Sequence, residues 1–137
     1  MIKNVKKQVN NQRGLTLIEL LAVIVILGII AAIAIPSIGS IIAKSKFDAS
    51  KADAIQVLNA TKIYMTETGN TNEDNITPEK LGTYVSEVKN ITSWTVKVDA
   101  GVPKITATTV NSKKDGTKHT WKDAPLSVVE ETKFDDK

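Results

Sequence analysis

Residues 12–26 read QRGLTLIELLAVIVI, and they open a long apolar run. The run extends to Ala43, and its last 24 residues carry no charge. About 20 apolar residues are enough to cross a bilayer as a helix. We therefore predict a membrane-spanning helix over residues 15–43, with a single carboxylate, Glu19, near its start.

Charge is distributed unevenly along the 137 residues. Residues 1–14 carry four basic side chains and no acidic one, whereas the rest of the chain has 14 basic and 15 acidic side chains. The formal net charge of +3 therefore describes the first residues and not the body, which argues against a nucleic-acid-binding protein. The absence of cysteine excludes a disulfide framework and a thiolate metal site.

Composition divides the chain into four zones. They are a basic leader peptide (1–14), an apolar transmembrane helix (15–43), an amphipathic half of the same helix (44–67) and a globular, β-rich head (68–137). A proline inside a helix can kink it without ending it, so Pro36 does not separate the two helical zones. The simplest arrangement is one helix from about Leu15 to Glu67, ended by Thr68-Gly69-Asn70.

One face of residues 44–67 is apolar. Its members recur at steps of three, four or seven residues: Phe47, Ala54, Leu58, Thr61 and Met65. Ile55 and Val57 flank this stripe. Such spacing is typical of an amphipathic helix that buries one side in a core. We predict that the stripe packs against the head.

The head is predicted to be a small antiparallel sheet. Alternating apolar residues favour strands over 93–99, 104–110 and 117–121. Turns are expected at Asp99-Ala100-Gly101 and at Lys113–Gly116. The predicted fold class is α+β, a lollipop-like arrangement in which the long helix packs on the sheet.

Two prolines carry further expectations for the head. Thr77 followed by Pro78 is typical of a helix start, and this helix is expected to reach about Val88. Pro125 is expected to leave only an edge strand or a tail after it.

Three interpretations compete for the apolar segment. A secretory signal peptide has an apolar region of about 7–15 residues, much shorter than this one. A plain single-span anchor fits the basic leader, but it leaves Glu19 unexplained. A carboxylate at a helix centre costs roughly 2.5–3.5 kcal/mol. Glu19 lies near the end of the span, where its side chain could reach the head groups at a lower cost. If the chain is cut after Gly14, the new ammonium of Leu15 lies four residues before Glu19, on the same helix face. The acid and the amine could then pair, within one chain or between neighbours.

The segment RG-LTLIELLAVIVILGIIAAIAIPSI resembles the class III signal of type IV pilins and pseudopilins. The resemblance covers residues 1 to about 45, and the rest of the chain is similar only in layout. The matching features are a short basic leader, Gly14 at the cut, an apolar first mature residue, Thr16, Glu19, Gly28 and Pro36. One departure is Leu15, where the family most often has phenylalanine.

The resemblance implies how the chain is processed and assembled. A membrane prepilin peptidase would cleave after Gly14 and methylate the amine of Leu15. Thr16 and Glu19 would act in assembly, Glu19 by pairing with the terminal amine of a neighbouring subunit. The apolar helices would bundle into the core of a homopolymer, and the heads would form its outside.

Other implications concern conformation, partners and location. The segment between Gly28 and Pro36 would melt on assembly. A pilus assembly platform and its ATPase machinery would act on the subunit. The precursor would be a single-pass membrane protein with a cytoplasmic leader and an outside head, and the assembled form would be a cell-surface filament.

Alternative functions remain open. The same features fit the major pseudopilin of a type II secretion or competence (DNA-uptake) system. A single-span, membrane-anchored binding module is an alternative from a different class. An enzyme is not expected, nor is a cofactor or a metal, because the chain has one histidine, no phosphate loop and no nucleophile motif.

Single residues also have simpler explanations. Thr16 and Glu19 form a capping-box pattern, Gly28 can permit close helix packing, and Pro36 can be an ordinary kink. His119 is expected to be an ordinary strand residue. A small basic loop contains Lys113, Lys114 and Lys118. It is expected to be a solvated hairpin, and DNA contact is the alternative.

Overall fold

The computed structural model describes residues 2–110 and 115–135, with side chains from Thr16 onwards. The chain forms two compact units, Met1–Ile38 and Gly39–Lys137. The first is helical where it is described, and the second contains the end of the same helix and a sheet. The predicted turn residues Lys113 and Lys114 lie outside the described part.

Helix α1 spans Ile2–Thr68. The helix begins earlier than the expected start near Leu15, because the leader residues from Ile2 are helical as well. The helix passes through Pro36 without a break. Next to this proline, the Ser37 hydroxyl donates to the carbonyl oxygens of Ile33 and Ala34, at 3.3 and 2.9 Å.

The predicted end of α1 is confirmed. Gly69 follows the helix with φ +71°, in the left-handed region that favours glycine. Its N–H donates to the Met65 carbonyl oxygen at 2.9 Å, which is a typical glycine C-cap. The Thr68 hydroxyl also bonds back to the Tyr64 carbonyl, at 2.8 Å.

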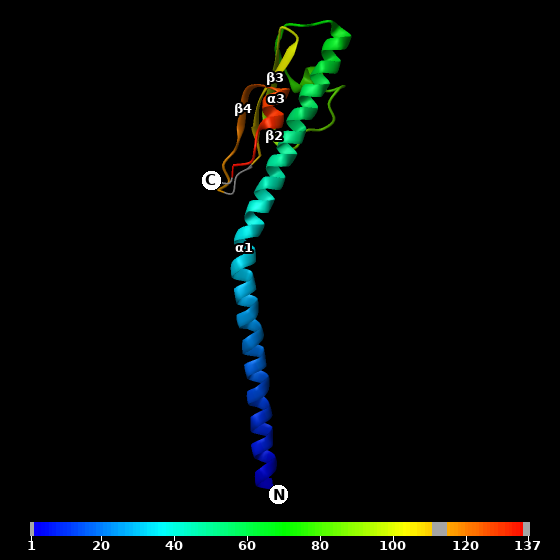
Figure 1. The fold of residues 1–137 in the computed structure, drawn as a ribbon. Coiled ribbons are helices and arrows are strands. Elements are labelled where there is room, and N and C mark those ends of the chain that lie inside the picture. The colour runs from blue at the N-terminus through cyan, green and yellow to red at the C-terminus, as the bar shows by residue number, and fades with distance from the viewer. Residues whose placement is uncertain (1, 111–114, 136–137) are drawn as a thin grey trace. The chain divides into compact units, whose positions relative to one another are not determined.

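Four antiparallel strands form one sheet in the order β1-β2-β3-β4. They are β1 (Glu73–Ile76), β2 (Ile91–Asp99), β3 (Val102–Thr109) and β4 (Thr120–Pro125). Two short helices, α2 (Pro78–Leu81) and α3 (Leu126–Glu131), complete the head (Figure 1). The predicted α+β, pilin-like fold class is confirmed.

Two details of the head differ from the prediction. Helix α2 ends at Leu81 and does not reach Val88. The segment after it is held by side chains of α1 instead. The carboxylate of Asp53 accepts the backbone N–H groups of Lys89 and Asn90, at 3.1 and 2.7 Å. These two hydrogen bonds fix the chain just before β2.

The last strand and the segment after it also differ from the prediction. Strand β4 begins at Thr120 and not at residue 117, and after Pro125 the chain turns into α3. Pro125 is the N-cap residue of α3, and its backbone is extended, with φ −72° and ψ 168°. Lys51 of α1 donates to the carbonyl oxygens of Glu130 and Thr132, so it holds the end of α3.

The core lies between one face of α1 and one face of the sheet. Trp94, Val96 and Val98 of β2 are buried, as their alternation predicted. The apolar stripe of α1 is confirmed: Phe47, Ala54, Leu58 and Thr61 are buried, and Met65 packs at the margin. Ser50, which the prediction omitted, is buried in the same stripe and donates to the Asn90 carbonyl at 2.6 Å.

A charged cluster joins β1 to the end of α1. Glu73 accepts hydrogen bonds from the Lys80 ammonium at 2.6 Å, the Tyr64 hydroxyl at 3.1 Å and the Asn70 amide at 3.2 Å. The hydrogen bond from Lys80 is the main reason that the pKa of Glu73 lies below its usual 4.5. The ionised form of Glu73 therefore stabilises the folded head.

This cluster predicts a pH-dependent contribution to stability. Because the pKa of Glu73 is lower in the folded than in the unfolded chain, its contribution is present above pH 4.5 and is lost as the pH falls through the folded pKa. We expect Glu73→Gln to be less stable than wild type at pH 7 and nearly equal to it at low pH. Urea unfolding at several pH values measures this difference, and a constant difference down to the lowest pH would contradict it.

Candidate functional site

The N-terminal part of α1 exposes an unusually apolar surface. From Leu17 to Ile42, every leucine, isoleucine and valine side chain keeps between 50% and 72% of its surface exposed. An 18-residue window of this helix has a mean hydropathy of 3.0. Its length and composition suffice to cross a membrane. Since soluble surfaces rarely expose large contiguous apolar patches, this one suggests a membrane-anchoring helix.

Glu19 is the one acid in this part of the helix, and its side chain is exposed. Gly14 and Leu15 lie within α1, so the bond between them is part of a continuous helix in the uncut chain. The capping-box explanation of Thr16 and Glu19 does not hold for this chain, because Thr16 lies inside a helix that starts at Ile2. Thr16 could become an N-cap only after a cut at Gly14.

Gly28 and Pro36 both lie inside regular helix. A Cβ added at Gly28 would meet nothing within 4 Å, so no contact within this chain requires glycine there. Pro36 cannot donate to the carbonyl of Ala32, four residues earlier, so one helical hydrogen bond is missing. In a single chain these residues weaken the helix without interrupting it, and melting on assembly stays a prediction.

His119 was expected to be a strand residue. In the structure it lies just before β4 and outside any strand. Its ring contacts Phe47 and Trp121 edge-on, with ring centroids 5.5 and 5.0 Å apart. Its backbone N–H donates to the Thr109 hydroxyl at 2.8 Å. These contacts give His119 a packing role in the head. Among the described residues, no cluster of His, Asp and Glu side chains could hold a metal ion.

Together, these features define a pilin-like architecture: an exposed apolar helix with one acid near its start, followed by a four-stranded antiparallel sheet. The family model of the prokaryotic N-terminal methylation motif matches residues 9–35. This motif is the class III signal of type IV pilins and pseudopilins, so the resemblance seen in the sequence is confirmed. The comparisons with curated proteins and with solved structures found no match.

The motif has three consequences for this chain. It supports a type IV pilin-like or pseudopilin precursor. Proteins of this motif family are structural and not enzymatic. The exposed apolar helix is consistent with membrane anchoring of such a precursor. The match includes Gly14, Leu15, Glu19 and Gly28 and ends just before Pro36.

Proposed function

We propose that this protein is the precursor of a structural subunit of a type IV pilus-like filament. It is inserted into the membrane through α1, with the leader in the cytoplasm and the head outside. A prepilin peptidase cleaves after Gly14 and methylates the amine of Leu15. The mature subunit then leaves the membrane and polymerises through its N-terminal helix, with the help of an assembly platform and its ATPase.

The exposed apolar surface of α1 carries this proposal. Burying a leucine or isoleucine side chain contributes about 1.5–3 kcal/mol, and α1 exposes many such side chains between Leu17 and Ile42. Lipid covers them in the precursor. Outside the membrane, the same surface on other copies of the chain can replace the lipid.

Glu19 gives this assembly a direction and a register. An isolated carboxylate is costly among apolar helices, so its pairing with a cation favours one arrangement strongly. Cleavage after Gly14 creates such a cation at Leu15. The amine of one subunit and Glu19 of a neighbour then neutralise each other in the filament core.

The first test is the N-terminus of the mature protein. We expect mass spectrometry of the protein from its native host to find a chain that begins at Leu15 and carries one additional methyl group on its amine. A strain without the prepilin peptidase should yield the intact precursor as a control. A mature chain that starts at Met1, or near Ala34, would contradict the proposal. Identification of this chain in sheared surface filaments would support a pilus subunit.

A further inference from the structure

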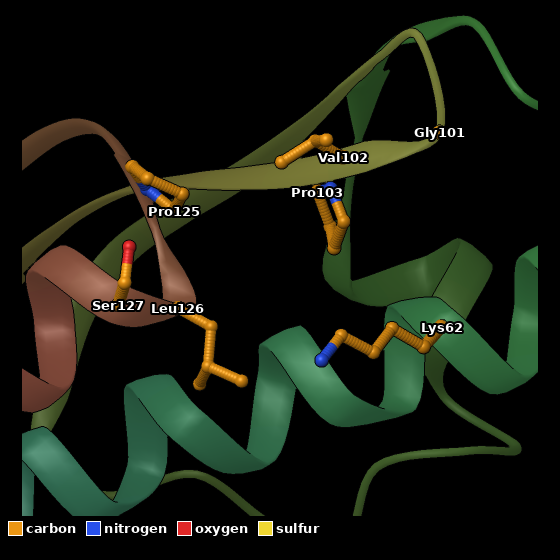
Figure 2. A pocket seen from close by; sticks show the side chains of 7 residues that line it. All are labelled: Lys62, Gly101, Val102, Pro103, Pro125, Leu126 and Ser127. Atoms are coloured by element: carbon orange, nitrogen blue, oxygen red, sulfur yellow. The ribbon is translucent and has the colours of Figure 1, made fainter.

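The head has few large apolar side chains exposed to solvent. Within the described residues beyond Ala43, three are exposed: Ile63, Val102 and Val128. Val102 lines a pocket of about 270 Å³, and Val128 comes directly after another lining residue, Ser127. The other lining residues are Lys62, Gly101, Pro103, Pro125 and Leu126 (Figure 2). This Lys62 pocket therefore combines apolar walls with one cation.

The Lys62 side chain extends toward Leu126, with Pro103 above it on the sheet side (Figure 2). Among the described residues, no carboxylate lies within 4.0 Å of its ammonium, whereas Lys80, Lys97 and Lys104 each pair with an acid. The pocket is smaller than the usual 300–1,000 Å³ of small-molecule sites, and few polar side chains line it. Its chemistry fits an acidic side chain with apolar neighbours on another protein.

The two flanks of α1 contact different parts of the head. Lys51 and Lys62 are eleven residues apart, about three helical turns, so they lie on the same flank. Lys51 contacts the end of α3 on this flank. Asp53 lies about 200° away around the helix and holds the segment before β2 on the opposite flank. The Lys62 pocket and residues 82–90 therefore lie on opposite sides of the head.

The segment on the opposite flank offers an exposed acid. Glu87 keeps 76% of its side chain exposed and pairs with Lys89 at 3.0 Å. Because Lys89 is 69% exposed as well, this pair contributes little and can be exchanged for another partner. Val85 and Val88, on either side of Glu87, are partly buried hydrophobic residues.

We propose that the Lys62 pocket of one subunit receives the Glu87 segment (residues 82–89) of a neighbouring copy. Identical subunits with parallel helices present one flank to the opposite flank of the next, which is a head-to-tail contact that can repeat indefinitely. The Glu87 carboxylate then pairs with Lys62 against the apolar walls. This inference rests on the proposed filament function, because only a polymer brings the two flanks together at high effective concentration.

The geometry also predicts a stagger. The Glu87 segment lies at the height of Gln56, since the Gln56 amide donates to Ser86 at 2.5 Å. Lys62 is six residues further along α1, which corresponds to about 9 Å of helix. The neighbour that supplies Glu87 is therefore displaced along the helix axis by roughly this distance.

Cysteine crosslinking in filaments tests the contact, because the chain has no cysteine of its own. We expect filaments of the Lys62→Cys/Glu87→Cys variant to give a ladder of covalent oligomers with a short bismaleimide. The control pairs Lys62→Cys with Thr95→Cys, an exposed position on β2, and should stay monomeric. Intact filaments that give no ladder, or the same ladder as the control, would overturn the inference and leave the filament function standing.

A second experiment reverses the charges of Lys62 and Glu87, and it tests the contact even if the cysteine variant does not assemble. Lys62→Glu should lower filament yield about tenfold, and Lys62→Glu/Glu87→Lys should restore most of it. Thermal unfolding of the full-length Lys62→Glu subunit in detergent should match wild type, because Lys62 is exposed and its ammonium forms no ion pair with the part of the chain that the structure describes. Equal yields of wild type and Lys62→Glu, or a double variant as poor as the single one, would overturn the contact.

Discussion

Replacing Glu19 with alanine is expected to leave the precursor in the membrane and to lower filament yield by a factor of ten or more. Removing one partner of a buried charge pair typically costs about 3–5 kcal/mol, because the other charge stays unpaired. In the proposed filament, the unpaired charge would be the amine of Leu15. Membrane insertion should not suffer, because alanine is easier to insert than glutamate.

The measurement compares sheared filaments with the membrane-bound pool in strains that carry only one form of the subunit. Ser37→Ala is a control, since it removes a polar side chain from the apolar part of the same helix without removing a charge. Its filament yield should lie well above that of Glu19→Ala. Normal filament yield from Glu19→Ala would refute the role assigned to this acid.

Leu58→Ala is expected to have the largest effect on the head. Leu58 is fully buried at the centre of the α1 stripe, between the helix and the sheet. Truncating such a side chain destabilises a protein by about 2–5 kcal/mol, because apolar contacts are lost and a cavity remains. This is a large fraction of the roughly 5–15 kcal/mol that stabilises a typical domain.

Urea unfolding followed by tryptophan fluorescence measures this loss, since Trp94 and Trp121 are both buried in the head. Ile63→Ala is the control on the same helix. Ile63 is 53% exposed, so its truncation in the isolated subunit should change the unfolding free energy by no more than about 0.5 kcal/mol. Equal unfolding midpoints for the two variants would contradict the packing of α1 on the sheet.

The candidate site could be predicted from the sequence because its residues are neighbours in the chain. Gly14, Leu15 and Glu19 lie within one or two helical turns, and a helix fixes their relative positions without any tertiary contact. The methylation motif is confirmed over residues 9–35. The roles of the individual residues remain predictions that the experiments above address.

The boundaries in the head were harder to predict, because distant side chains set them. Helix α2 stops at Leu81, and the chain before β2 is held by Asp53, which accepts the backbone N–H of Asn90, 37 residues further along the chain. Helix α3 begins directly after Pro125, where the sequence suggested an edge strand or a tail, and Lys51 holds its end. Such hydrogen bonds join residues whose proximity arises only once the sheet packs on α1.

The sequence by itself determined the membrane-type helix, its acid and the apolar stripe of the head. Their periodicity and length result from local helix geometry and from the cost of burying charge. Only the tertiary structure decided which flank of α1 carries the Lys62 pocket and which carries Glu87. That pocket forms where α1, the β2–β3 turn and the start of α3 meet, and no local pattern encodes such a meeting.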